Sequence, residues 1–234
     1  MMPPPPNEQG QTRVSGLRAA RRIPFRGIAP DLRVSVTERK LPHWTQPGAT
    51  YFVTFRLADS IPQSLLLEWQ HEREIWLRLH PQPWSPDVEV EYHHRFTQRM
   101  EDWLDTGTGE CHLRRPDIRA AVERHLLHFD GQQYDVDAYV LMPNHGHCLI
   151  TPCAPHSLSK VMQSIKGVSA NTCNKLLTRT GRTFWQDESH DHIVRDGDEL
   201  ERLRRYIANN PIKAKLREGE YTLSLREVLY VETP

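Results

Sequence analysis

Residues 134–151, YDVDAYVLMPNHGHCLIT, constrain the fold more than any other part of this chain. Two runs rich in β-branched and aromatic residues flank a Pro-Asn pair, which favours a turn. The stretch therefore predicts an antiparallel hairpin. Because residues i and i+2 of a strand face the same side of a sheet, His145 and His147 should point one way. Cys148 and Ile150 should point the other way, into a core.

This histidine pair has two interpretations. The two imidazoles could hold one divalent metal ion between them, or they could merely close the end of a strand. The cysteines do not extend the site, since Cys111, Cys148, Cys153 and Cys173 are scattered without a CxxC pair. That spacing predicts neither a disulfide framework nor a zinc ribbon, and it fits a reducing cytoplasm.

The periodicity of the rest of the chain predicts an order that resembles a split βαβ sheet with helices on one face. The expected elements are, in order, a strand at 48–58, a helix at 64–80, a helix at 115–131, strands at 134–142 and 145–151, a helix at 156–177, a short strand around 192–194 and a helix at 198–210. The stretch 87–105 is ambiguous, with a helical second half. Pro211 should end the last helix.

Composition divides the chain into an arm, a domain and a tail. The domain is expected at 41–218 and contains an acidic helical insertion at about 60–112. A Pro- and Arg-rich segment at 1–40 is expected to be a disordered basic arm, and 219–234 a C-terminal tail.

Charge is balanced overall, with 30 Lys and Arg against 30 Asp and Glu, so the total says nothing about partners. Residues 157–217 carry twelve basic and seven acidic residues, whereas 68–110 carry four basic and ten acidic ones. A basic C-terminal third can bind nucleic acid, although a solvated helix surface explains the same pattern. There is no apolar run near twenty residues and no N-terminal apolar stretch, so neither a membrane span nor a secretory signal is expected.

The last predicted helix carries a second group of reactive side chains. Leu200, Leu203 and Ile207 form its apolar stripe, and Tyr206 and Asn210 lie at the edge of that stripe as an i, i+4 pair. If this edge faces the strand with the two histidines, the parts match a phosphoryl-transfer site, in which a metal ion polarises the phosphate and the tyrosine attacks it. Ordinary packing of the tyrosine and a C-terminal cap by the asparagine remain the alternative.

Four stretches together resemble one known family. The segments GATYFVTFRL, MPNHGHCLI, FWQDESHDHIVRD and RRYIANNPIKA occur in the order found in REP-associated tyrosine transposases, which belong to the single-tyrosine HUH nuclease superfamily of insertion-sequence transposases. The resemblance covers about residues 44–217. It implies an α+β fold with a ferredoxin-like HUH core and a central antiparallel sheet, to which this chain adds the helical insertion and the N-terminal arm.

The same resemblance implies an activity and its residues. Tyr206 would be the nucleophile, and His145, His147 and Asn210 would bind Mg²⁺ or Mn²⁺. The substrate would be single-stranded hairpin DNA of the repetitive extragenic palindrome type. Cleavage would leave a 5′-phosphotyrosine and a free 3′-hydroxyl, and rejoining that hydroxyl would complete DNA transposition or recombination. The protein is expected to be a monomer or homodimer in the cytoplasm, associated with the nucleoid. Neither a membrane nor a small-molecule cofactor is expected as a partner.

The chain departs from the family at the residue between the histidines, which is usually bulky and apolar and is Gly146 here. Ligation should survive, but the strand should lose packing. Further residues are candidates for supporting the site or contacting DNA, with ordinary structural roles as the alternative: His192, Lys166, Arg195, Arg202, Arg204 and Trp185.

Two other classes of protein fit part of the pattern. A domesticated, non-catalytic module that binds hairpin DNA or RNA would account for Gly146 and the insertion. A small metal-binding regulator would account for the histidines, but for neither Tyr206 nor the basic C-terminal third.

Overall fold

The computed structural model describes residues 25, 27, 35–38, 42–81, 83–187 and 189–226. In this part of the chain the main sheet has five strands in the order β6-β3-β5-β4-β7, and each neighbouring pair is antiparallel. The strands are β3 (Tyr51–Arg56), β4 (Tyr134–Leu141), β5 (His145–Pro152), β6 (His190–Ile193) and β7 (Thr222–Leu225).

Three helices cover this sheet: α4 (Pro116–Leu126), α5 (Leu158–Leu176) and α6 (Gly197–Lys213). The chain order β3-α4-β4-β5-α5-β6, with β3 and β5 central, is that of a split βαβ sheet, which confirms the predicted α+β fold. Among the helices in the described part of the chain, none is long and apolar enough to cross a bilayer.

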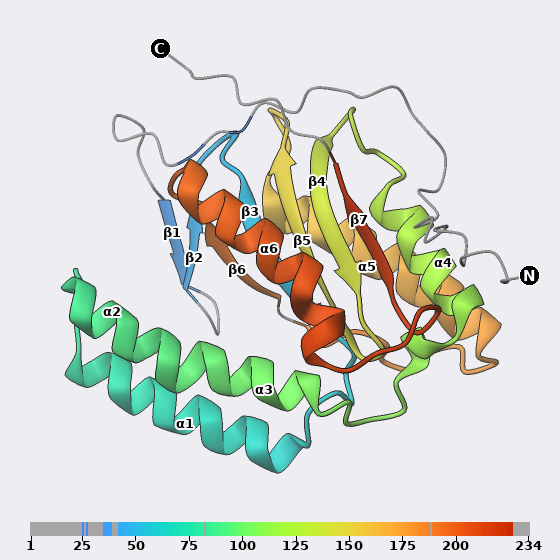
Figure 1. Ribbon diagram of the computed structural model, residues 1–234, viewed down its shortest axis with the longest axis horizontal. Coiled ribbons are helices and arrows are strands. Elements are labelled where there is room, and N and C mark those ends of the chain that lie inside the picture. The colour runs from blue at the N-terminus through green and yellow to red at the C-terminus, as the bar shows by residue number, and fades with distance from the viewer. Residues whose placement is uncertain are drawn as a thin grey trace, which may run out of the picture.

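The helices lie on both faces of the sheet rather than on one, so the expectation of a single helical face is wrong for α6 (Figure 1). Val53 and Phe55 of β3 pack into the core formed with α4 and α5, whereas Phe52 packs with Leu200 and Ile207 of α6. Both faces of the strand are therefore buried, and each is covered by its own helices.

The insertion between β3 and α4 is helical, as predicted. It consists of α1 (Gln63–Leu79), α2 (Pro86–Tyr92), the π-helical η1 (His93–Gln98) and α3 (Arg99–Asp105), and a short 3₁₀ turn η2 (His112–Arg114) follows it. The ambiguous stretch 87–105 is thus helical throughout. Figure 1 shows α1 lying alongside α2 and α3 across one end of the sheet. A separate core lies between α1 and the α2–α3 segment and is formed by Trp69, Trp76, Tyr92 and Phe96.

Helix α6 does not end at Pro211, contrary to the expectation from the sequence. Asp196 caps its start by accepting a hydrogen bond from the Glu199 backbone N–H at 2.7 Å. At the other end the Ala214 N–H still reaches the Asn210 carbonyl at 3.0 Å. The proline removes one donor from the helix, but the next turn closes without it, so Asn210 stays within the helix.

Two short elements lie in segments that the sequence left without structure. β1 (Ser35–Glu38), which pairs with β2 (Pro42–Thr45), belongs to the arm expected to be disordered, and β7 belongs to the expected tail. Each has four residues, too few for a clear alternation. The rest of the predicted arm lies outside the described residues, apart from residues 25 and 27. The division into arm, domain and tail stays a prediction.

Candidate metal and nucleophile site

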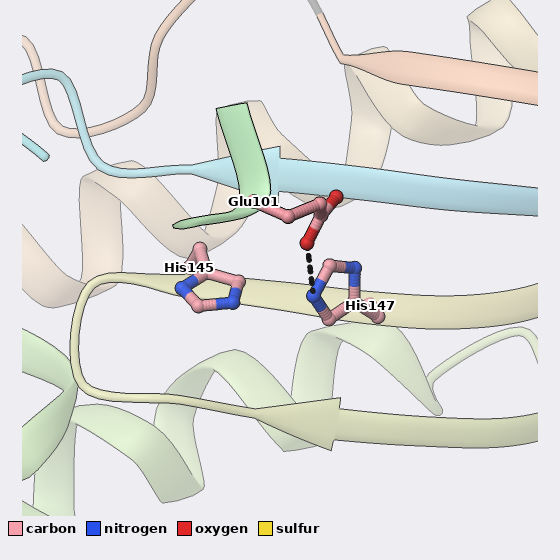
Figure 2. A group of neighbouring side chains, drawn as sticks. All are labelled: Glu101, His145 and His147. Carbon is pink, nitrogen blue, oxygen red and sulfur yellow. Dashed lines mark ion pairs between the residues drawn. The ribbon is translucent and has the colours of Figure 1, made fainter. Parts of the chain in front are cut away.

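His145 and His147 stand side by side on β5, on the sheet face that α6 covers (Figure 2). Both side chains are 0 % exposed, and their ring centroids are 4.8 Å apart. Cys148 and Ile150 lie in the opposite core, as the alternation predicts. Two buried imidazoles thus face one small region between β5 and the elements above it.

Asn144 fixes which nitrogen of His145 carries the proton. The Asn144 amide nitrogen donates to the carbonyls of Leu104 at 3.1 Å and Thr108 at 3.2 Å, so the amide oxygen must act as an acceptor. His145 Nδ1 lies 2.8 Å from that oxygen and therefore donates to it. The buried Nε2 of His145 keeps its lone pair and has no hydrogen-bond partner in the part of the chain that the structure describes, as a metal ligand requires.

Thr54 holds the ring of His147. Its Oγ1 lies 2.9 Å from His147 Nδ1, and the same side chain acts to lower the pKa of the nearby Glu101. With Nδ1 engaged by Thr54, Nε2 is the ring nitrogen left for a metal ion. That Nε2 lies 3.4 Å from Glu101 Oε2 (Figure 2).

Burial keeps both imidazoles neutral. It lowers the pKa of His145 to about 3 and holds that of His147 well below its usual value. Ligand atoms of Glu101, His145 and His147 lie within 4.8 Å of one another, and all three side chains are buried. Two neutral imidazoles and one carboxylate form a donor set that fits a divalent ion.

Glu101 comes from α3 of the insertion and was not among the residues expected from the sequence. It is 7 % exposed, and burial raises its pKa to about 7, against an opposing hydrogen bond from Tyr206. Its spacing from Leu104, which is also buried, places it on the inner side of α3. That spacing is the one signal that separates it from the exposed carboxylates of the insertion.

Tyr206 lies on α6 against the histidine face. Its ring is edge-on to His147, with centroids 5.3 Å apart, and edge-on to Phe52 at 5.8 Å. Its hydroxyl donates a hydrogen bond to Glu101 Oε2. Burial and the adjacent Glu101 raise the pKa of Tyr206, so the phenol keeps its proton in this arrangement.

Asn210 lies one turn beyond Tyr206 on the same helix. It is 1 % exposed, and within the described residues neither its Oδ1 nor its Nδ2 has a hydrogen-bond partner. Its amide is near enough to Tyr206 to act on the pKa of that residue. A buried amide without partners is costly, and a ligand at this position would account for it.

Gly146 is required by packing, which corrects the expectation that its strand loses packing there. A Cβ at this position would lie 2.7 Å from Phe55 Cζ and 3.1 Å from Leu141 Cδ2. Phe55 on β3 is paired with Gly146 in the strand register, so its ring fills the space that a larger residue would take. The departure from the family pattern therefore leaves the sheet packed.

Two of the candidate supporting residues have structural contacts. Lys166 Nζ donates to the carbonyls of Gln186 and Asp187, each at 2.6 Å, and so holds the segment before β6. Trp185 is 5 % exposed, and its Nε1 donates to Ser169 Oγ at 2.9 Å. Both fit the structural alternative given for them.

The other candidates lie on β6, just before α6 and along α6. His192 Nε2 is 3.6 Å from Glu199 Oε1, and the Arg195 side chain pairs with Glu89 of the insertion. Arg204 pairs with the buried Asp137, so it supports the sheet. Arg202 is exposed and remains available to a charged partner.

Comparison with known proteins gives a match to one family model and similarity to solved structures. Residues 119–210 match the model of the family described as "Transposase IS200 like". No curated protein matches the chain. One similar solved structure is a REP-associated tyrosine transposase bound to a REP hairpin, with 19 % identity, a TM-score of 0.41, and coverage of 73 % of this chain and 71 % of that one. Another is a protein from Deinococcus radiodurans R1 described as a candidate transposase, with 13 % identity, a TM-score of 0.33, and coverage of 69 % and 89 %. The chain thus carries, over residues 119–210, the sequence pattern of the IS200-like transposase family, as the resemblance of its motifs predicted.

Proposed function

We propose that this protein is a metal-dependent strand transferase that cuts and rejoins single-stranded DNA through a tyrosine. The observation that carries the proposal is the position of Tyr206. Its hydroxyl contacts Glu101, and its ring lies against His147, although these residues come from three separate elements. A phenol beside a buried group of metal-binding donors is the arrangement that phosphoryl transfer to tyrosine needs.

The donor set supports a site for Mg²⁺ or Mn²⁺. His145 Nε2, His147 Nε2 and a carboxylate oxygen of Glu101 would hold the ion, and the orphaned amide of Asn210 is available as a further ligand. When bound, the ion would polarise the scissile phosphate and stabilise the charge that develops on its oxygens.

The chain's own residues then have distinct tasks. Tyr206 gives up its phenolic proton, its oxygen forms a bond to phosphorus, and the bond from phosphorus to the 3′ oxygen breaks. The 3′ oxygen takes up a proton and leaves as a hydroxyl, while the 5′ side stays bound as a phosphotyrosine. Attack by a 3′-hydroxyl reverses these steps and restores the tyrosine. Asn144 and Thr54 keep the imidazoles oriented throughout.

The substrate proposed is single-stranded hairpin DNA of the repetitive extragenic palindrome type, following the family resemblance of the motifs. The chain would act at the nucleoid in the cytoplasm, as a monomer or a homodimer. The exposed Arg202 on α6 is a candidate contact to the DNA backbone.

A covalent-adduct assay tests the proposal. The purified protein is mixed with labelled single-stranded hairpins from DNA beside its own gene, with and without Mn²⁺, and separated on a denaturing gel. The expected result is a metal-dependent shifted band that is lost in Tyr206→Phe and kept in Tyr221→Phe. Tyr221 is a half-buried tyrosine packed near α6, so it is a matched control. Retained cleavage by Tyr206→Phe would rule out this nucleophile.

One observation favours a second candidate, a non-catalytic module that binds hairpin DNA or RNA. The Tyr206 hydroxyl is engaged by Glu101, and its pKa is raised, as expected for a phenol that does not react. In that case wild-type protein would retain hairpins on a native gel but form no adduct with Mn²⁺ or Mg²⁺.

A further inference from the structure

A pocket lies between the insertion helices and β3, directly beside the candidate site. We name it the insertion pocket. Trp69, Tyr92 and Phe96 line it on the insertion side, and Thr54, Arg56 and Glu101 line it next to the site. Thr54 is hydrogen-bonded to His147 and Glu101 to Tyr206, so the pocket and the candidate site share two residues as a common wall.

Arg56 is the unusual residue of this pocket. It is 8 % exposed, and in the described part of the chain no carboxylate forms an ion pair with it. Among the described residues, its side chain makes one hydrogen bond, from Nη1 to Ser60 Oγ at 3.2 Å. Because Arg56 pairs with His145 in the strand register, its side chain is on the histidine face. A buried guanidinium with unused donors costs stability unless a ligand engages them.

The chemistry of the walls indicates the ligand. Aromatic and apolar side chains, among them Trp69, Phe96 and Met100, make a phosphate a poor occupant, because its charge would lose water there. A nucleobase has an apolar face for such walls and acceptor atoms at its edge for a guanidinium. Gln70 and Gln186 also line the pocket and offer amide groups for the same edge.

We infer that the insertion pocket receives one unpaired base of the DNA strand, from the nucleotide next to the scissile phosphate, with Arg56 donating hydrogen bonds to its edge. Because the pocket and the candidate site share Thr54 and Glu101, a base held there would fix the register of the strand over Tyr206. The inference rests on the proposed function for its substrate class. It assigns the insertion a role in substrate recognition, beyond the carboxylate that Glu101 brings to the candidate site.

The test is a binding scan with a single-stranded hairpin oligonucleotide, measured by fluorescence anisotropy without metal. Each unpaired base is removed in turn by an abasic substitution. At one position near the cleavage point, the loss of the base should weaken binding to wild-type protein about tenfold. Arg56→Gln and the pocket-filling Gln70→Trp should bind the intact and abasic strands equally. Arg124→Gln, an exposed arginine on α4 across the sheet, should behave as wild type.

Three results would overturn the inference. One is a scan in which no position differs, and another is an Arg56→Gln variant that keeps the base preference. The third is uniform weakening by Arg56→Gln with a salt slope reduced by about 0.7, because this marks a phosphate contact. Thermal melting is the folding control, and Arg56→Gln should melt no lower than wild type because it loses an unpaired buried charge. Adduct formation is measured separately. If wild-type protein forms the adduct but shows no base preference, the inference about the pocket is refuted and the proposed function stands.

Discussion

Tyr206 donates a hydrogen bond from its hydroxyl to Oε2 of Glu101, a residue 105 positions earlier in the chain. The same oxygen lies 3.4 Å from His147 Nε2. One carboxylate from the insertion therefore connects the candidate nucleophile to the candidate metal ligands. Lys213, further along α6, reinforces the contact through an ion pair with Asp105 of α3 at 2.8 Å.

Replacing Glu101 should weaken metal binding. In Glu101→Gln the charged oxygen facing His147 is lost, and the affinity for Mn²⁺ should fall by at least about tenfold, because removal even of outer-layer partners has that effect. Titration calorimetry measures it. Asp102→Asn is the matched control, since Asp102 is the next residue on α3 and its side chain is 57 % exposed. Equal affinities in wild type and Glu101→Gln would contradict the assignment of this ligand.

The raised pKa of Glu101 gives a pH-dependent stability. Its pKa is about 7 in the folded protein and 4.5 in the reference state, so between these values the folded protein binds more protons. Its contribution to stability therefore falls as the pH rises from 4.5 through 7. Relative to wild type, Glu101→Gln should gain roughly 2–3 kcal/mol between pH 5 and pH 8. Denaturant unfolding in chelator measures this, and a difference that does not change with pH would disprove it.

Asn144 should matter to both stability and metal binding. Asn144→Ala leaves His145 Nδ1 without its acceptor and removes the amide donor from the carbonyls of Leu104 and Thr108, which should cost about 2–3 kcal/mol. It should also weaken Mn²⁺ binding by roughly 10–100-fold, because the imidazole loses its orientation. Asn144→Asp keeps the acceptor for His145 and loses the donors. Compared with Asn144→Ala, it should therefore restore metal affinity more than stability. Equal recovery of both would argue against separate roles for the amide oxygen in metal binding and the amide nitrogen in stability.

Gly146→Ala should destabilise the sheet by about 1–3 kcal/mol, because the new Cβ would meet Phe55 at 2.7 Å. Phe55→Leu in the same chain should restore part of the loss, and a double-mutant cycle in denaturant measures the coupling. Gly167→Ala is the control, since no atom of the described residues lies within 4 Å of a Cβ there and α5 should gain up to about 1 kcal/mol. Additive effects of Gly146→Ala and Phe55→Leu would show that the ring does not occupy this space.

The sequence predicts the parts of this protein that depend on local periodicity. The hairpin with His145 and His147, the amphipathic α6 and the split βαβ order all follow from spacings of two and of three to four residues. The apolar stripe of α6 does not determine which face of the sheet the helix covers, because both faces of the sheet carry buried apolar residues. The continuation of α6 past Pro211 depends on hydrogen bonds that form only in the folded turn.

Glu101 is the residue of the candidate site that local periodicity does not identify. Its place beside Tyr206 results from the packing of a whole insertion across the sheet, a contact between residues 105 positions apart. Its spacing from Leu104 shows that it faces inward, but not what it faces. The structural roles of Lys166, Arg204 and Trp185 likewise depend on partners that lie far away in the chain.

The central claim is that Tyr206 becomes covalently linked to DNA, and mapping the linked residue tests it most directly. Wild-type protein is incubated with a single-stranded hairpin and Mn²⁺, digested with trypsin and nuclease, and analysed by mass spectrometry. Trypsin should release YIANNPIK, residues 206–213, in which Tyr206 is the sole hydroxyl-bearing side chain. The account predicts a nucleotide mass on this peptide that disappears with chelator. A nucleotide on a different peptide, or cleaved DNA with no linked peptide, would contradict it.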